Sequence, residues 1–99
     1  MADLNSDLRM AVDSGEVVLG IEETTRAINV SRAKLVVVSA VGNEATVSDL
    51  SHLCGIAGVR LVRFAGNSME LGAVCGKPYS VSSLAVVSPG NSKILEVEY

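Results

Sequence analysis

Lys34-Leu35-Val36-Val37-Val38-Ser39-Ala40 is the stretch that decides the fold. Its centre, Leu35 to Val38, is an unbroken apolar run with no polar residue between. A strand covered on both faces has this composition, whereas a strand with one wet face alternates apolar and polar residues. We therefore predict a buried strand whose sheet carries helices on both faces.

Segments with helical spacing alternate with short apolar segments on both sides of this strand. Leu4, Leu8, Ala11 and Val12 recur at the spacing of a helix that rests one face on a core. The expected elements, in chain order, are a helix over 4–12, a strand over 17–19, a helix over 22–29, the strand at 34–40, a helix over 46–57, a strand over 59–64, a helix over 67–76, and strands over 81–87 and 94–97. Such alternation is typical of an α/β domain.

Local signals indicate where these elements begin and end. Asn67 and Glu70 are spaced as a helix cap and its return partner, and Thr46 resembles a second helix start. Gly15 is expected in the left-handed conformation that often ends a helix. The residues at 88–91, Ser-Pro-Gly-Asn, predict a turn between the last two strands.

Length and composition support a single domain over residues 1–99, and the strand buried on both faces makes it a three-layer α-β-α domain. Hydrophobic residues make up 48% of the chain, enough for one aliphatic core. No apolar run approaches the ~20 residues that span a bilayer. The start, Met1-Ala2-Asp3-Leu4-Asn5, lacks the basic and apolar regions of a signal peptide. We expect a cytoplasmic protein with no membrane partner.

Patterns that carry catalysis or bind metals are missing from the sequence. It has no P-loop, no G-x-S-x-G and no G-x-G-x-x-G. Cys54 and Cys75 lack metal-type spacing and stand among apolar neighbours, where Cys acts as a small buried hydrophobe. His52 is the only histidine, so a His-based metal site or triad lacks partners. We expect no enzyme, no metal and no cofactor.

The charge balance runs against nucleic-acid binding, because binders usually carry a basic patch and this chain has a net charge of −3. Net charge describes the whole molecule, however, and one face can still be positive. The basic residues are scattered along the chain, so the fold would have to assemble any patch from Arg9, Arg26, Arg32, Lys34, Arg60, Arg63, Lys77 and Lys93.

The residues from Gly20 to Ile28 lie where a buried strand passes into a helix. A helix N-terminus offers unpaired N–H groups to a phosphate, and glycine lets another backbone approach. Glu23 can accept hydrogen bonds from a guanine edge, and Arg26, three residues on, lies on the same helical face. The alternative is that the acids of this first turn only stabilise the helix dipole, by roughly 0.3–1 kcal/mol.

Short matches to one known family occur in order along nearly the whole chain. They are Asp7-Leu8-Arg9, Ser14-Gly15, Gly20, Ala33-Lys34-Leu35-Val36-Val37-Val38, Glu70-Leu71-Gly72, Gly76-Lys77-Pro78, Ser82-Ser83-Leu84-Ala85-Val86-Val87 and Pro89-Gly90. On these residues the chain resembles the archaeal and eukaryotic ribosomal family called large-subunit protein thirty, within the superfamily of kink-turn RNA-binding proteins. The resemblance implies a three-layer α-β-α sandwich with a four-stranded mixed sheet.

The resemblance also implies that three loops at one end of the fold contact RNA. Here they are residues 20–26, 40–43 and 78–82. Glycine would admit the RNA backbone, the acid would read a guanine, basic residues would meet phosphates, and apolar residues would cover an extruded base. The implied RNA-binding residues are Gly20, Glu22, Glu23, Arg26, Val41, Gly42, Asn43, Lys77, Tyr79, Ser80 and Val81.

Two of these positions depart from the family pattern. The superfamily's first loop reads Gly-x-Asn-Glu-x-x-Lys; here Glu22 replaces the Asn, while Glu23 and Arg26 keep the residue types, with Arg for Lys. Val41 stands where the ribosomal family commonly places an Asn against a base. A bidentate Asn–base contact is worth roughly 1–3 kcal/mol in the analogous DNA case, and valine cannot supply it.

We therefore expect a structural component of the large ribosomal subunit that binds kink-turn ribosomal RNA, contacts other ribosomal components and is a monomer when free. One alternative is a kink-turn protein of RNA-guided modification particles, which the loop at 20–26 favours. The other is a diverged protein-interaction module that binds no RNA. The acidic net charge, Glu22 and Val41 favour this second alternative.

Overall fold

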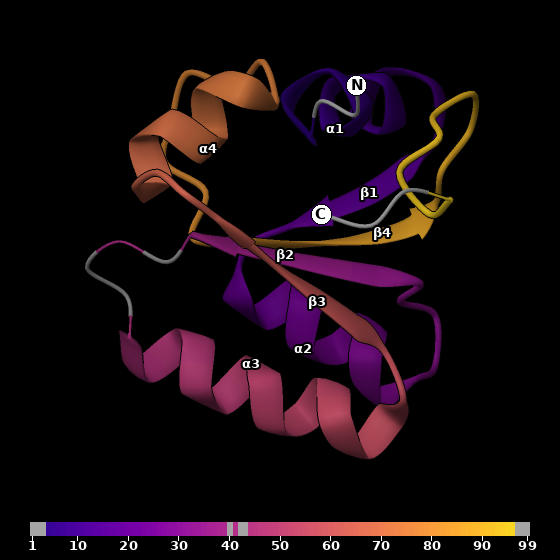
Figure 1. Cartoon of the computed structure of the whole chain (residues 1–99), viewed down its shortest axis with the longest axis vertical. Helices are drawn as coiled ribbons and strands as arrows, with labels where there is room; N and C mark the ends of the chain where they lie inside the picture. The colour runs from indigo at the N-terminus through magenta and orange to yellow at the C-terminus, as the bar shows by residue number, and fades with distance from the viewer. Residues whose placement is uncertain (1–3, 40, 42–43, 97–99) are drawn as a thin grey trace.

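The computed structural model describes residues 4–39, 41 and 44–96. Within these residues, every helix is followed by a strand (Figure 1). They are α1 (Leu4–Ser14), β1 (Glu16–Leu19), α2 (Ile21–Asn29), β2 (Leu35–Ser39), α3 (Glu44–Ala57), β3 (Arg60–Phe64), α4 (Ser68–Val74) and β4 (Ser83–Ser88). The α/β class expected from the sequence is confirmed.

The four strands form one mixed sheet in the order β1-β4-β2-β3. Strand β2 pairs in parallel with β3, while β4 lies antiparallel to both β2 and β1. Every residue of β2 is buried. The unbroken apolar run of the sequence is therefore an interior strand covered on both faces, as predicted.

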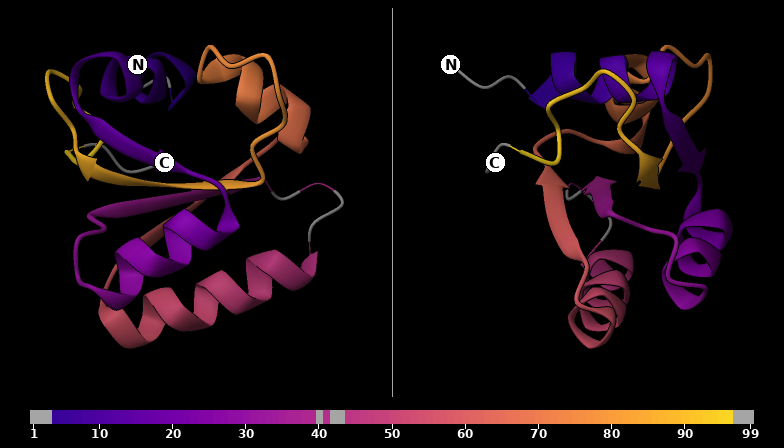
Figure 2. Two further views of the ribbon diagram at one scale, coloured as in Figure 1. Left: turned by 180° about the vertical axis from the view of Figure 1, so that it is seen from behind. Right: turned by 90° about the vertical axis from the view of Figure 1, so that its right-hand side faces the viewer.

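Helices cover the two faces of the sheet in pairs, α1 with α4 on one face and α2 with α3 on the other (Figure 2). Alternate residues of β2 serve the two cores. Leu35 and Val37 pack with Leu8 and Leu71 of the first pair, whereas Val36 and Val38 belong to the second cluster. Burying one such side chain contributes about 1.5–3 kcal/mol, so both cores depend on the composition of this strand.

Of the two helix starts predicted from capping residues, the structure confirms that of α4 but not that of α3. The capping box of α4 is confirmed: the Glu70 N–H donates to Asn67 Oδ1 at 2.9 Å, and the Asn67 N–H donates to Glu70 Oε1 at 3.1 Å. The start predicted at Thr46 is wrong, because α3 already includes Glu44. Thr46 therefore lies inside the first turn of α3.

Gly15 corrects the sequence prediction in a different way. It does not have a positive φ, unlike Gly58, Gly76 and Gly90. A Cβ at Gly15 would instead lie 2.1 Å from the carbonyl oxygen of Ser88. Glycine is required here because the turn after β4 passes directly against the end of α1.

The strand predicted over 94–97 is also wrong for the residues that are described. Residues 94–96 form a turn, in which the Glu96 N–H donates to the carbonyl oxygen of Lys93 at 2.9 Å. The Ile94 side chain is fully buried in the core beneath α1 and α4. An apolar anchor rather than strand pairing thus explains this segment. Val97 lies outside the described residues.

Among the helices in the described ranges, none is long and apolar enough to cross a membrane.

Candidate nucleic-acid interface

Sheet topology brings the predicted loops together at one edge. Because β4 runs against both β1 and β2, its amino end meets their carboxyl ends. The Gly20 N–H donates to the carbonyl oxygen of Ser83 at 2.8 Å, and the Ser39 N–H donates to that of Ser82 at 2.9 Å. Residues after β1, after β2 and before β4 therefore share one end of the molecule, on the left in Figure 1.

Gly20 links β1 to α2 with a backbone that favours glycine. Its φ is 102°, in the region that L side chains rarely adopt. A Cβ would meet no atom within 4 Å, so conformation and not crowding selects glycine. The open space beside Gly20 is available to an approaching backbone. Helix α2 begins at Ile21, one residue earlier than predicted.

Glu23 and Arg26 form an ion pair on the exposed surface of α2. Arg26 Nη1 lies 3.3 Å from Glu23 Oε1, and their side chains are 69% and 49% exposed. An exposed pair of this kind is worth about 0–1 kcal/mol. Either group can therefore turn to an external ligand at little cost. Glu22 is exposed beside them.

Thr24 fixes the first turn of α2 to the sheet, a role the sequence analysis missed. Its side chain is fully buried and its Oγ1 accepts a hydrogen bond from Ser83 Oγ at 3.4 Å. Thr24, Ala27 and Ile28 are the buried residues of this helix and share the spacing of one helical face, which was the available signal. With Thr24 held inward, Glu22 and Glu23 remain on the outside.

The loop after β2 is described at one position. Val41 is 57% exposed, so it presents an apolar side chain at this end. Gly42 and Asn43, both predicted contact residues, lie outside the described residues.

The loop before β4 rests on α4. A Cβ at Gly72 would lie 2.0 Å from the carbonyl oxygen of Tyr79, so the loop and the helix touch through their backbones. The Lys77 N–H donates to the carbonyl oxygen of Gly72 at 2.9 Å. Tyr79 is 53% exposed, and Ser80 is exposed beside it.

Val81 does not have the exposed position that a base-covering side chain requires. It is 2% exposed within the core beneath α1 and α4, and its N–H donates to the carbonyl oxygen of Ser68 at 2.9 Å. The exposed apolar surface at this end comes instead from Tyr79, Val41 and Ile21. The role predicted for Val81 is thus corrected to that of an anchor for the loop.

The cysteines are structural in this fold. Both are buried free thiols, Cys54 on the buried face of α3 and Cys75 at the end of α4. Burial raises the pKa of both, and that of Cys75 to about 11 even though Lys77 and Arg9 oppose the shift. No cluster of three His, Cys, Asp or Glu side chains suited to a metal occurs in the described part of the chain.

These observations define a three-layer sandwich with loops from three connections gathered at one end, the class that the sequence resemblance implied. The family model described as the Ribosomal protein L7Ae/L30e/S12e/Gadd45 family matches residues 2–96. The chain belongs to this family.

Named relatives agree with this membership, and a solved structure shares the fold. The chain is 37% identical over 97 residues to Large ribosomal subunit protein eL30 of Pyrobaculum neutrophilum, covering 98% of this chain and 96% of that protein. It is 36% identical over 96 residues to the protein of the same name from Methanobrevibacter smithii, covering 97% of both. A structure of a Bacillus halodurans protein of unknown function has the same fold, with a TM-score of 0.81, 24% identity, and coverage of 97% of this chain and 95% of that chain.

Proposed function

We propose that this protein is a structural component of the large ribosomal subunit and that its three gathered loops bind a kink-turn in ribosomal RNA. The observation that carries the proposal is the meeting of the three loops at one edge, joined through Ser82 and Ser83. Near-full-length similarity to proteins named Large ribosomal subunit protein eL30 supports the ribosomal setting. The work of the protein is then to hold RNA in shape at the ribosome, which needs no catalytic group and no cofactor.

The segment from Gly20 to Arg26 would contact the bend itself. The open space at Gly20 lets an RNA backbone come close to the start of α2. The Glu23 carboxylate can accept from the N–H donors of a guanine, and this frees Arg26 from its ion pair to meet a phosphate. A guanine at the bend can be unpaired, with its edge open to a side chain. Sequence-specific recognition of RNA generally uses unpaired bases, because side chains cannot read the deep, narrow major groove of an RNA duplex.

The other two loops would cover an extruded base. Tyr79 offers an aromatic ring for stacking, and the exposed Val41 adds apolar contact. Lys77, half-buried at the start of its loop, supplies a second cation, while Ser80 is an exposed hydroxyl beside Tyr79. Gly42 and Asn43 stay in the proposed interface as neighbours of Val41 in sequence.

The alternatives are less well supported. The relatives named above are ribosomal, which speaks against a role in RNA-guided modification particles. A protein-interaction module without RNA does not account for an open glycine, an acid and a cation brought to one edge with an exposed aromatic ring. We propose contacts with other ribosomal components and a monomeric state for the free protein.

The test is a titration of the protein against a kink-turn RNA and a straight duplex of equal length at two salt concentrations. The proposal requires a preference for the kinked RNA and an affinity that falls as salt rises, because bound phosphates release counterions. Equal binding to both RNAs, or no binding to either, would refute it.

A further inference from the structure

Arg63 lies near the edge of the sheet that gathers the three loops, but on a different surface of the molecule. It is the next-to-last residue of β3 and pairs in register with Val38, while Phe64 pairs with Ser39. Because β2 and β3 are parallel, both end at the same edge. Strand β3 stands last in the sheet order, so one side of it borders no other strand of the described sheet.

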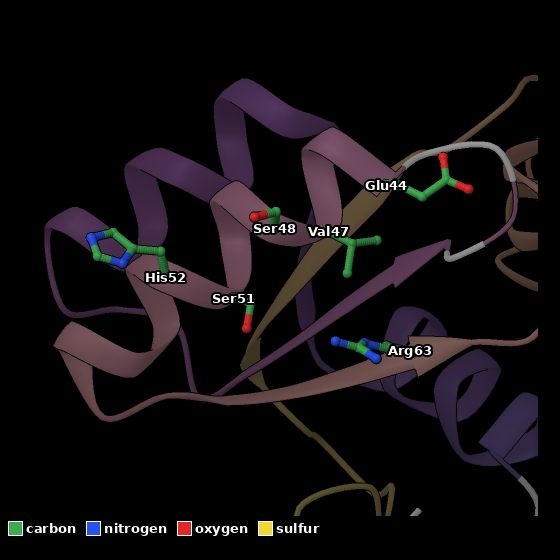
Figure 3. Close-up of a pocket in the computed structure, with 6 residues that line it drawn as sticks. All are labelled: Glu44, Val47, Ser48, Ser51, His52 and Arg63. Atoms are coloured by element: carbon green, nitrogen blue, oxygen red, sulfur yellow. The ribbon is translucent and has the colours of Figure 1, made fainter.

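A hollow of about 590 Å³ opens between α3 and β3 at this position (Figure 3). The Arg63 guanidinium points from β3 toward α3, and the Ser51 hydroxyl points back from the facing turn of the helix. Glu44 stands at the start of α3, at one end of the hollow. The other lining residues are Val47, Ser48 and His52. Arg63 also lines two smaller hollows of about 440 and 410 Å³ on the side toward α1.

The charge of Arg63 is not neutralised within the described residues. Arg9, Arg26 and Arg32 each form an ion pair with a carboxylate, at 3.0, 3.3 and 2.7 Å respectively. Arg63 makes no ion pair or side-chain hydrogen bond with another described residue, and its side chain is exposed to solvent. An exposed guanidinium presents donors in a planar fork that fits two phosphate oxygens.

We propose that Arg63 binds an RNA phosphate, and that the RNA interface extends from the three loops into the hollow between α3 and β3. Ser51 assists as a hydroxyl donor to the same phosphate. This inference rests on the proposed function, since it assigns a further contact to the same RNA. The surface at β3 supplies positive charge that the loop end, with Glu22 and Glu23 beside Arg26, offers only sparingly.

The distance across the sheet allows one RNA to reach both surfaces. Strands β1 and β3 are the two edges of a four-stranded sheet, three strand spacings of about 4.8 Å apart, or roughly 15 Å. Val41 belongs to the loop after β2, and Glu44, three residues later, begins α3 and lines the hollow. The chain therefore passes directly from the loop end to the hollow. An RNA stem leaving the bend along α3 would pass over Arg63.

An acidic protein segment is the competing occupant, and the observations favour RNA. The hollow adjoins the proposed RNA-binding end. Its polar lining residues Arg63, Ser51, Ser48 and His52 can all donate hydrogen bonds, and Glu44 at the start of α3 is the one acid among the lining residues. A phosphate takes several donors at once, which suits this set.

The experiment compares Arg63→Gln with Arg60→Gln on a kink-turn RNA whose stems both extend beyond the bend. The two variants lose the same charge from the same strand, but Arg60 pairs with Leu35 at the opposite end of β3. We expect Arg63→Gln to weaken RNA binding and to make the salt dependence shallower. The magnitude of the negative slope of log K against log salt should fall by about 1, which is the effect of one lost phosphate contact. Arg60→Gln should leave the slope near that of the unchanged protein.

Two further variants sharpen the reading. Arg63→Lys keeps the charge, so the salt slope should be retained while affinity falls. Ser51→Ala should weaken binding without changing the slope. Equal salt slopes for Arg63→Gln and Arg60→Gln would overturn the extension of the RNA interface to β3. The hollow would then be left to the competing occupant, an acidic protein segment. Failure of the unchanged protein to prefer kinked RNA would overturn the proposed function itself.

Discussion

The carboxylate of Glu23 and the guanidinium of Arg26 lie 3.3 Å apart on the solvent-facing side of α2. Each is a proposed RNA contact, so in the free protein two parts of the interface neutralise each other. The pair is exposed and weak, and it holds both side chains near the start of the helix without locking them. Binding of RNA would exchange this one ion pair for two external contacts, one to a base and one to a phosphate.

We predict that Glu23→Gln lowers the affinity for kinked RNA by about tenfold or more while leaving stability nearly unchanged. A lost bidentate contact to a base costs roughly 1–3 kcal/mol, and each 1.4 kcal/mol is tenfold in affinity. The exposed ion pair contributes about 0–1 kcal/mol to folding, so the melting temperature should move little. Titration with kinked RNA and thermal unfolding measure the two effects.

Glu22→Gln is the matched control, because it removes the same charge from the adjacent exposed position of α2. It should leave RNA affinity unchanged or raise it, since a carboxylate near phosphates repels them. Equal losses for Glu22→Gln and Glu23→Gln would contradict a specific role of Glu23.

Gly20→Ala should destabilise the protein by about 1–2 kcal/mol through backbone strain alone. The φ of 102° is unfavourable for alanine, although a Cβ would meet no atom within 4 Å. Gly55→Ala provides the contrast: its Cβ also meets nothing, but Gly55 lies inside α3 without a positive φ. That change should stabilise the helix by about 0.5–1 kcal/mol. Urea unfolding of both variants tests the argument, and a loss of stability in Gly55→Ala would count against it.

Gly72→Ala should be more damaging than Gly20→Ala, and for a different reason. The new Cβ would lie 2.0 Å from the carbonyl oxygen of Tyr79, which belongs to the backbone and cannot turn away like a side chain. The loop must therefore move off α4, at a cost typical of overpacking, about 1–3 kcal/mol or more. Because Tyr79 moves with the loop, kinked-RNA affinity should fall too. Gly55→Ala again serves as the control, and normal RNA binding by a destabilised Gly72→Ala would separate Tyr79 from the interface.

The parts of the fold that the sequence predicted are those in which local pattern and tertiary position agree. The apolar run of β2 leaves no polar face, so burial on both sides followed from composition. Asn67 and Glu70 satisfy each other within a single helical turn, so their spacing was sufficient to predict the cap. The gathering of three loops at one edge came from the family resemblance, since spacing along the chain does not reveal strand order.

The errors arose where a distant segment decides the outcome. The family resemblance implied that Val81 covers a base, but its N–H donates to Ser68 and its side chain enters the core. Gly15 ends a helix and so matched a left-handed cap, whereas its real constraint is Ser88, far along the chain. Ile94 was predicted to begin a strand, whereas its side chain is buried in the core from a turn. None of these contacts leaves a periodic signal in the sequence.

Alkaline conditions should destabilise the protein through Cys75. Burial raises the pKa of this thiol from 9.0 to about 11, so the unfolded chain loses the proton at lower pH than the folded protein does. Stability from this group is fully present below pH 9 and declines as pH rises from about 9 to 11, by roughly 2–3 kcal/mol in total. Urea unfolding at several pH values measures the decline, and Cys75→Ala should flatten it, although the cavity lowers stability at every pH. Reaction with a thiol reagent gives a second readout: at pH 8 Cys75 should react slowly in the folded protein and rapidly in urea. Fast labelling of the folded protein at that pH, at the rate of an exposed thiol, would show that the side chain is not shielded in the core.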